Sequence, residues 1–524
     1  MGSLGRLRWG EFAVFAAFAS VSCWVLAMNL WLTVRHGDVW SGTDGVAAQD
    51  QMQYLAWIRD ASEHGLASNL YDLDPTPHDF IQPLVAVSAL LTAAGAAPWL
   101  TLLLWKPVAL VGVYLAVRGF VWASVDRPAE RLLALVAALF FTGWGVLVLH
   151  MLDSHANAIQ WSAVTNELWV PHWMWGYEFG AIAFACMVAA ALFYARDRER
   201  GAAGWKAPML GALAAWIHPW QGQVLLVILL ASELILRRSG WRLILPTACA
   251  TAIPLIYYVV LRRTDISWEQ TSQAAHRTWP LWIVLLSLLP LALPALLAYR
   301  SRPRTVLGAI TLAWPPVVIA LVFVNQSLGA NGVLHALLGL SVPLAVLAVI
   351  GLRSVSRRRG PPLAAVVAAS LLVVVPPAYE QMKVARKTVK SVYNGKDANF
   401  LTAEEDDALE WLRRQPGPGG VLTSPYLGAA VPGRTGRATY VGNSFWTPDF
   451  YARAIEFFEL LQGQPPHTAQ SFVRRTGARF VLTGCPPPID LSPSLADVLV
   501  SQETFGCARV YELRVDPERK TTRH

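Results

Sequence analysis

The sequence predicts a mostly α-helical, polytopic membrane protein that ends in a small α/β domain. Three observations lead to this fold class. Hydrophobic residues make up 54% of the chain and charged residues only 15%, whereas soluble domains carry about 25% charged residues. Apolar runs such as 281–299 and 333–352 have about the 20 residues that a helix needs to cross a bilayer. After residue 378 no further run of this kind occurs.

About eleven transmembrane spans are expected. We place them at residues 11–33, 99–117, 132–149, 179–195, 207–217, 223–236, 243–261, 280–299, 305–324, 335–350 and 361–378. No small-residue cleavage site follows the first run, so it is expected to stay as an anchor. His218-Pro219 divides the run 207–236, since proline removes a helix hydrogen bond. The segment 81–94 is short and is expected to lie at, or dip into, the outer interface.

The basic residues of the short connections predict the orientation. With the N-terminus in the cytoplasm, the inner connections hold 19 Lys and Arg residues and the short outer ones hold 5, as the positive-inside rule requires. The chain is therefore expected in the inner (plasma) membrane, with residues 379–524 on the extracytoplasmic side. Because these loop charges explain the net charge of +8, no nucleic-acid partner is expected.

Two domains are predicted, a transmembrane domain at 1–378 and a soluble extracytoplasmic α/β domain at 379–524. Thr402 and Glu405 form a capping-box pattern for a helix that ends near Arg414. Strands are expected at 421–423, 438–441, 479–483 and 508–513, and further helices at 449–461 and 467–476. If this domain lies outside, Cys485 and Cys507 can form a disulfide.

The first outside loop, residues 34–80, is acidic and is expected to contain juxtamembrane helices. Residues 50–60 have apolar side chains at helical spacing, which fits an amphipathic helix lying on the membrane. Asp50 lies at the N-terminal end of this helix, and Tyr54 follows one turn later on the same face. Taken alone, Asp50 could simply be an acidic residue that the helix dipole favours.

Lys106 is expected within the second span. A lysine at this depth either binds an anion, such as a phosphate, or extends its amine to the headgroups. His218 at the outer turn and His335 at the start of the tenth span are candidate hydrogen-bond donors to phosphate or sugar. Each could instead have a structural role at a helix end.

The second outside loop, residues 150–178, is rich in ionisable and aromatic side chains. His150, Asp153 and His155 are weak candidates for ligands of a divalent metal ion, because their spacing matches no recognised site. His155 and Glu167 are also candidate substrate-binding residues. The tryptophans of this loop predict an interfacial belt, with stacking on sugar rings as the alternative.

The order of several motifs resembles the GT-C glycosyltransferases, such as the lipid A aminoarabinose transferases and the protein O-mannosyltransferases. The segment Asp50-Gln-Met-Gln-Tyr54 matches the Asp-Glu-x-x-Tyr start of the first loop in that family, except that Gln51 replaces Glu. Pro83, Gly95 and Lys106-Pro107 follow in the family's order. The segment 436–442, followed by the helix from Asp449, is similar to the soluble domain of bacterial relatives.

The resemblance implies a GT-C-like bundle and an inverting transfer of a sugar from a polyprenyl-phosphate carrier to a glycan, lipid or protein acceptor. It implies Asp50 as the general base and Asp153 as a second acidic residue at the site. Two alternatives stay open, a transporter or flippase for a lipid-linked glycan and a catalytically inactive scaffold with the same fold. The sequence contains no Walker loop and no Gly-x-Ser-x-Gly motif, which argues against an ATP-driven pump or a serine hydrolase.

The expected topology can be tested with a reporter fused after His524. An enzyme that folds only outside the cytoplasm should be active in this fusion, because the bias of basic residues places the C-terminus there. Activity of a cytoplasm-only reporter at the same position would contradict the whole arrangement.

Overall fold

The computed structural model describes residues 3–145, 158–236, 240–274, 278–330, 332–356, 363–390, 399–485 and 490–514. The chain forms two compact units, each made of segments that are far apart in the sequence. The first unit comprises residues 1–24, 105–260 and 275–386, and the second comprises 25–104, 261–274 and 387–524.

In the part of the chain that the structure describes, the first unit is helical. Its elements are α1 (Ser3–Ser22), α6 (Trp105–Ser124), α7 (Pro128–Phe140), α9 (Ala158–Leu168), η2 (Val170–Met174), α10 (Glu178–Arg200), α11 (Lys206–Ile217), α12 (Pro219–Leu236), α13 (Trp241–Thr264), α15 (Leu281–Leu296), η3 (Leu297–Arg300), α16 (Val306–Ser327), η4 (Val333–Leu337), α17 (Ser341–Ser356) and α18 (Leu363–Lys390). The last residues of α13 and α18 continue into the second unit.

Seven helices among the described residues are long and apolar enough to cross a membrane, and an eighth is added if a bent pair counts as one span. They confirm the predicted polytopic helical membrane protein. The seven are Pro98–Ser124, Glu178–Arg200, Pro219–Leu236, Trp241–Thr264, Leu281–Arg300, Val306–Ser327 and Val333–Ser354, and the bent pair is Trp9–Ser22 with Trp24–Arg35.

The remaining expected spans differ from the structure in length. α11 has 12 residues, or about 18 Å of helix, which is less than the ~30 Å hydrocarbon core. The break after it is where the sequence predicts it, because His218 is extended (φ −149°, ψ 102°) and α12 begins at Pro219. α4 (Pro83–Ala93), in the segment that is not expected to span the membrane, is also too short to cross it. The expected span 132–149 corresponds to α7, and its last four residues lie outside the described part.

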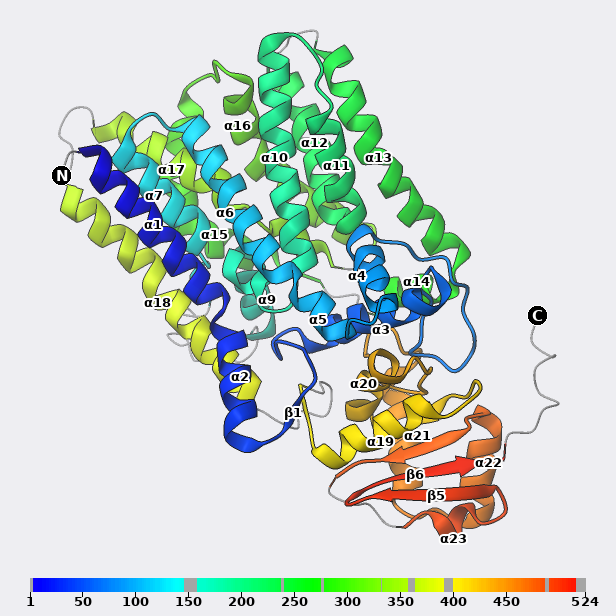
Figure 1. Cartoon of the computed structure of the whole chain (residues 1–524). Coiled ribbons are helices and arrows are strands. Elements are labelled where there is room, and N and C mark those ends of the chain that lie inside the picture. The colour runs from blue at the N-terminus through cyan, green and yellow to red at the C-terminus, as the bar shows by residue number, and fades with distance from the viewer. Residues whose placement is uncertain are drawn as a thin grey trace. The chain divides into compact units, whose positions relative to one another are not determined.

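Helix α10 lies at the centre of the first unit and packs against α6, α11 and α12. Figure 1 shows α10, α11 and α12 side by side. A buried carboxylate fixes each end of α10. Glu178 in its first turn pairs with Lys106 of α6 at 2.7 Å. Near its other end, Arg198 binds Glu233 of α12 through two nitrogens at 2.9 and 3.2 Å, and Tyr194 donates to the same carboxylate.

The second unit combines helices with a four-stranded sheet. Its elements are α2 (Trp24–His36), β1 (Val39–Trp40), α3 (Ala48–His64), α4, α5 (Pro98–Leu103), α14 (Ile266–Ala274), β2 (Phe400–Leu401), α19 (Ala403–Arg414), β3 (Val421–Leu422), α20 (Pro425–Thr435), α21 (Phe450–Leu461), α22 (Pro466–Thr476), β4 (Phe480–Thr483), α23 (Ser492–Leu495), β5 (Leu499–Phe505) and β6 (Ala508–Leu513). The strand order is β3-β4-β6-β5, with β3 parallel to β4 and the other pairs antiparallel.

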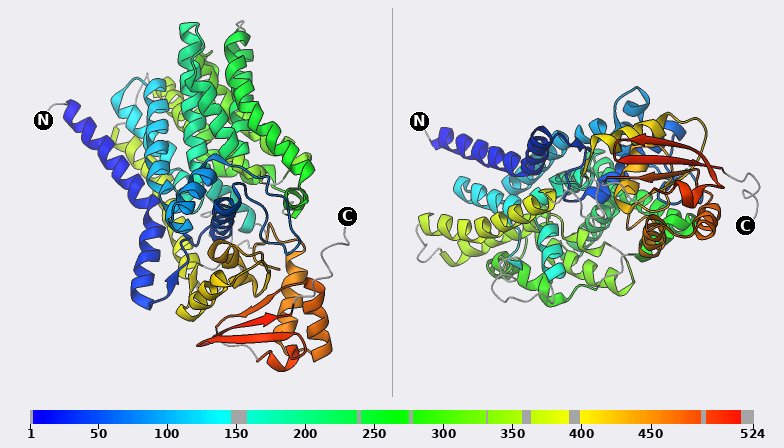
Figure 2. Two further views of the ribbon diagram at one scale, coloured as in Figure 1. Left: turned by 45° about the vertical axis from the view of Figure 1, so that its right-hand side comes forward. Right: turned by 90° about the horizontal axis from the view of Figure 1, so that it is seen from below.

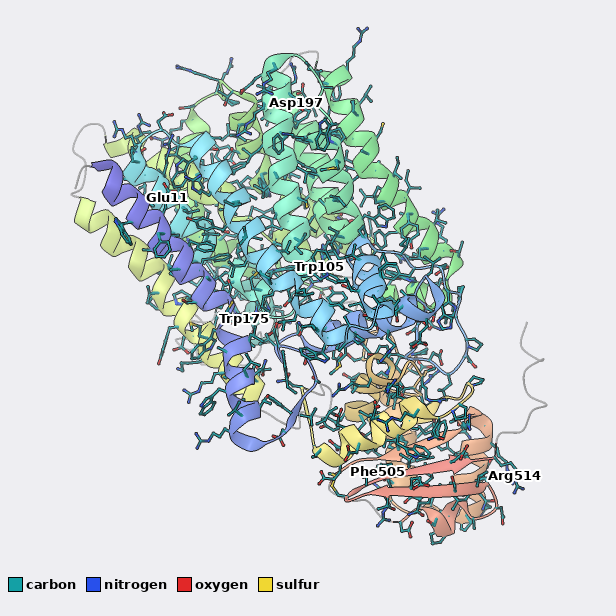
Figure 3. The ribbon with its side chains drawn as sticks, in the orientation of Figure 1. Glu11, Trp105, Trp175, Asp197, Phe505 and Arg514 are labelled. Atoms are coloured by element: carbon teal, nitrogen blue, oxygen red, sulfur yellow. A yellow bond between two sulfur atoms is a disulfide. The ribbon has the colours of Figure 1, made fainter. Side chains whose placement is uncertain are left out.

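The sheet packs between helices, and Figure 2 shows it from two further directions. On one face, Val481 and Tyr511 share a hydrophobic core with α21, α22 and α23. On the other face, Trp411 of α19 lies against Phe480 and Phe505 at 6.2 and 6.3 Å between ring centroids. Phe505 is labelled in Figure 3.

Most of the predicted elements of this sheet region are present. The capping box of Thr402 and Glu405 forms as expected, with both reciprocal bonds. The disulfide between Cys485 and Cys507 also forms, across a Cα–Cα distance of 5.3 Å. The expected strand 438–441 was wrong, because this segment makes only a single bridge, between Thr439 and Val421. β5 and α20 have no counterpart in the expected elements.

Candidate functional site

Three of the predicted substrate-binding residues meet in the first unit. Glu167 of α9 pairs with Nδ1 of His335 at 3.1 Å, although the two residues are 168 positions apart. The rings of His335 and His218 have centroids 5.3 Å apart. Trp173 contacts both rings, at 5.3 Å from His335 and 5.6 Å from His218, so the three rings form a triangle. We call Glu167, Trp173, His218 and His335 the imidazole cluster.

Local backbone features place these side chains. His218 occupies the extended residue between α11 and α12, where proline prevents a continuous helix. His335 lies in the short helix η4, which begins after Gly332 in the left-handed region at φ +65°. Gly180 of α10 allows Trp173 to approach, since a Cβ there would lie 2.4 Å from the indole ring.

One residue of the cluster and two residues near its members in the sequence have buried polar atoms without a hydrogen-bond partner within the described ranges. They are Nδ1 of His218, Oε1 of Gln221 and Oδ1 of Asn166. The Nε2 atom of Gln221 does donate, to the carbonyl of His335 at 3.0 Å. Because buried polar groups are nearly always satisfied, such a group indicates a ligand or water. The arrangement can therefore bind a polar molecule through imidazole and amide groups.

Lys106 is buried in a polar environment made by the protein itself. Its side chain is 5% exposed, and its ammonium pairs with Glu178 at 2.7 Å. It also donates to the carbonyl of Met174 at the end of η2. The ammonium of this lysine is therefore enclosed by the protein. Lys106 links α6 and α10 to the segment that carries Trp173, so its first physical role is to fix the imidazole cluster.

The tryptophans of the predicted second loop are core residues and not an interfacial belt. Trp161, Trp169, Trp173 and Trp175 are all buried, with 3% exposure or less. Trp175, labelled in Figure 3, donates to the carbonyl of Val21 at 2.9 Å. Neighbouring His172 is partly buried, and the loss of solvation lowers its pKa to about 4 against a smaller opposing effect of Glu167. This part of the first unit is thus well packed around the imidazole cluster.

In the second unit, Asp50 lies half-buried in the first turn of α3, as expected. Contacts from distant segments fix this turn. Ser444 donates its backbone N–H and its hydroxyl to the side chain of Gln49, and Asn443 donates to the Gln49 carbonyl at 2.9 Å. The helix is mostly buried against α4 and α20 instead of presenting a continuous apolar face. Asp50 therefore has a rigid support.

Gln51, the departure from the GT-C motif, has a specific partner. Its Oε1 accepts from the backbone N–H of Asp44 at 2.6 Å, and its Nε2 lies 3.4 Å from the Asp44 carboxylate. A glutamate in its place would bring a second negative charge against Asp44. The amide of Gln51 is therefore matched to Asp44, where a glutamate would be repelled.

Tyr54 and Trp57 continue along α3 from Asp50. Their rings are 6.1 Å apart, and Trp57 stacks on Trp268 of α14 and lies against Trp446 at 5.2 Å. Gln53, one position before Tyr54, is 2% exposed, and neither polar atom of its amide has a partner among the described residues. This helix thus presents an acidic, an aromatic and an amide group within two turns.

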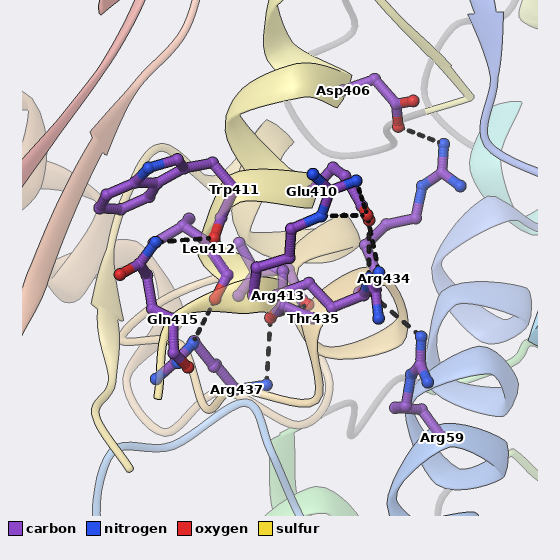
Figure 4. A network of polar contacts seen from close by, with 12 residues as sticks. Arg59, Asp406, Glu410, Trp411, Leu412, Arg413, Gln415, Arg434, Thr435 and Arg437 are labelled. Atoms are coloured by element: carbon purple, nitrogen blue, oxygen red, sulfur yellow. Dashed lines mark hydrogen bonds and ion pairs between the residues drawn. The ribbon is translucent and has the colours of Figure 1, made fainter. Parts of the chain in front are cut away.

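Arginine side chains line a cavity of about 420 Å³ on another part of α3. Arg59, Arg413 and Arg434 face it together with Asp406 and Glu410 (Figure 4). Arg434 binds Asp406, and Arg413 binds Glu410 at 2.6 Å. Burial, partly offset by Glu63, lowers the pKa of Arg59, and the nearby cations lower it further. Three guanidinium groups and two carboxylates thus line the cavity, and Glu63 pairs with Arg59 at 3.9 Å.

Arg437, from the motif that resembles bacterial relatives, has a structural role. Its guanidinium donates to the carbonyls of Leu412, Gln415, Gly417 and Gly419, as Figure 4 shows in part. It closes the C-terminal end of α19 and orders the turn that leads to β3.

His150, Asp153 and His155 lie outside the described residues, so their predicted roles remain predictions. The structure instead groups Asp60, His64 and His78 in the second unit. The sequence alone did not predict this group. The spacing of Asp60 and His64, four residues apart on one helix face, was the available signal, whereas His78 joins them only through the fold.

No family model and no curated protein matches the sequence. Solved structures of GT-C enzymes match most of the chain, and they belong to the superfamily whose motifs the sequence resembles. ArnT from Cupriavidus metallidurans bound to undecaprenyl phosphate is 12% identical, with a TM-score of 0.49 over 97% of this chain and 98% of that one. The apo Archaeoglobus fulgidus oligosaccharyltransferase is 14% identical, with a TM-score of 0.44 over 90% of this chain and 69% of that one. At these identities the likeness assigns no residue roles.

The role of Lys106 can be separated from that of its charge partner. Lys106→Met leaves the Glu178 carboxylate buried without its cation, which costs about 3–5 kcal/mol. We expect a clear loss of thermal stability in detergent. The double variant Lys106→Met/Glu178→Gln removes both charges and should recover most of that loss.

A lysine in an exposed ion pair provides the control. Lys383 pairs with Glu380 and is 54% exposed, so Lys383→Met should change stability by less than about 1 kcal/mol. Equal stability of the Lys106→Met and Lys383→Met proteins would contradict the structural role. A stable double variant that binds the donor tenfold more weakly would show that Lys106 also contacts the substrate.

Proposed function

We propose that this protein is an inverting glycosyltransferase of the plasma membrane that transfers a sugar from a polyprenyl-phosphate carrier to an acceptor on the extracytoplasmic face. The imidazole cluster carries the proposal, because it brings Glu167, His218 and His335 together from three distant segments and includes the buried Nδ1 of His218, which has no partner among the described residues. Asp50, at the rigid start of α3, supplies the carboxylate that such a transfer needs.

The carrier phosphate is assigned to the imidazole cluster. His218 can donate a hydrogen bond to a phosphate oxygen, and His335, whose Nδ1 faces Glu167, can donate from Nε2 when its ring is doubly protonated. A leaving phosphate needs such stabilisation as its charge develops. The structure supports His218 ahead of Lys106 for this role, because the ammonium of Lys106 is already engaged by Glu178 and Met174. Lys106 then acts as a positioning residue. Glu167 orients His335 through its bond to Nδ1.

Asp50 is assigned the role of general base. It takes the proton from the acceptor hydroxyl, and the resulting oxygen attacks the anomeric carbon as the bond to the phosphate oxygen breaks. A single displacement of this kind inverts the configuration. Tyr54, one turn later on α3, is assigned to substrate binding. Asp153 and His155 keep their predicted roles, Asp153 in orienting the acceptor or assisting a divalent metal and His155 in binding substrate.

The arginine-lined cavity favours an acceptor that carries a phosphate or a carboxylate. The pKa of Arg59 is lowered chiefly by burial, partly offset by Glu63. Burial disfavours the charged guanidinium, and a bound anion beside it would stabilise that charge. The extracytoplasmic position of the second unit is supported by the basic bias of the loops and by the Cys485–Cys507 disulfide.

The two alternatives have less support. A flippase for a lipid-linked glycan needs a polar path across the membrane. Among the described residues of the spanning helices, the buried charged groups lie near helix ends and are paired: Lys106 with Glu178, and Glu233 with Arg198. An inactive scaffold was suggested by Gln51, and the contact of Gln51 with Asp44 gives that residue a local structural role.

The variant Asp50→Asn tests the proposal. The amide keeps the size of the carboxylate but cannot accept a proton, so transfer should fall by about 10²–10⁴-fold. Donor affinity should stay unchanged, because the carrier phosphate is assigned to other residues. The assay follows transfer from a panel of radiolabelled polyprenyl-phosphate sugars to neutral and anionic acceptors.

Asp74→Asn is the matched control. Asp74 is an exposed acidic residue on the loop after α3, and its exchange should leave the rate unchanged. A wild-type rate for Asp50→Asn would show that Asp50 is only a helix-end charge. An equal loss in both variants would point to a general effect of charge on this loop.

A further inference from the structure

A group of metal-ligating side chains lies about 15 Å along α3 from Asp50, at 1.5 Å per residue. Nδ1 of His64 is 2.8 Å from Oδ1 of Asp60, and Nε2 of His78 is 3.3 Å from the same oxygen. The two imidazole rings have centroids 4.3 Å apart. All three ligand atoms lie within 4.8 Å of one another. The proposed transfer uses none of these residues.

The carboxylate of Asp60 is held in one orientation. Its side chain is 1% exposed. Its second oxygen, Oδ2, accepts from the backbone N–H of Ser68 at 2.6 Å and from the Ser68 hydroxyl at 2.8 Å. These two bonds leave Oδ1 directed at the imidazoles. Hydrogen bonds of this kind to the outer oxygen of a carboxylate are how proteins orient metal ligands.

The distances suit a tetrahedral metal ion. Bonds of about 2.0–2.2 Å from Zn²⁺ to nitrogen and oxygen place neighbouring ligand atoms of a tetrahedral site about 3.3–3.6 Å apart. The observed separation of 3.3 Å lies at the lower end of this range, and that of 2.8 Å is somewhat shorter. His64 and His78 are half-exposed, at 50% and 39%, so solvent can reach the fourth position.

We propose that Asp60, His64 and His78 bind a divalent transition metal ion, with Zn²⁺ as the best match to two imidazoles and one carboxylate. The ion would tie the end of α3 to the loop that leads into α4. Ala67 and Phe80 already pair across the base of this loop, with bonds of 3.0 and 3.1 Å. Phe80 in turn lies against Trp57 at 4.3 Å. The metal thus closes a loop that supports the aromatic side chains of α3.

The test uses the full-length protein in detergent, without a histidine tag and stripped of metal with a chelator. Zn²⁺ is titrated against a chromophoric competitor, and Co²⁺ is added separately to read the visible bands of a low-symmetry site. The wild-type protein should bind one equivalent. The double variant His64→Ala/His78→Ala should lose this equivalent, and Ser68→Ala should weaken it by about 10–100-fold.

His467→Ala is the control, because His467 is an exposed histidine on α22 of the same unit. It should bind Zn²⁺ as the wild type does. The proposal would be overturned if the wild type and the double variant bound Zn²⁺ equally, or if the wild type bound none. Asp60, His64 and His78 would then be only a hydrogen-bonded group. If the double variant does not fold, the site is tested on the wild-type protein alone, by chemical modification of its histidines. Zn²⁺ should protect His64 and His78 from diethylpyrocarbonate, and unchanged modification would contradict the site.

Discussion

The buried ion pair between Lys106 and Glu178 is the constraint on which the first unit depends. Two charges removed from water are tolerated only with close geometry and further hydrogen bonds, and here the Met174 carbonyl supplies one. Glu178 also lies in the first turn of α10, where the helix dipole favours a carboxylate. The pair joins α6, η2 and α10 at one point. Trp173 is one residue from this point, and it sets the positions of His218 and His335.

Much of the fold could be predicted from local sequence. Apolar length predicted the spanning helices, proline predicted the break at His218, and the Thr402 and Glu405 pattern predicted a capping box. These features depend on neighbours within a few residues. The wrong prediction of a strand at 438–441 also relied on local sequence alone. An apolar, β-prone segment does not show whether a partner strand lies beside it.

The candidate site was harder to predict because its contacts are distant in the sequence. Glu167, His218 and His335 were selected one by one, from loop position and residue type, and the fold shows that they meet. The partner of Lys106 was not predicted, because several acidic residues lie at similar distances from it along the chain. Nothing in the sequence distinguishes Glu178 from them. The structural role of the tryptophans was also missed, because composition does not distinguish an interfacial aromatic ring from one buried in a core.

The assignment of the carrier phosphate to the imidazole cluster can be tested most directly by photo-crosslinking. The probe is a polyprenyl-phosphate sugar with a photoreactive group next to the phosphate, bound to the wild-type protein and mapped by peptide mass spectrometry. Crosslinks should fall on the peptides that contain Trp173, His218 and His335, and unlabelled donor should remove them. Competed crosslinks confined to other parts of the chain would contradict the account.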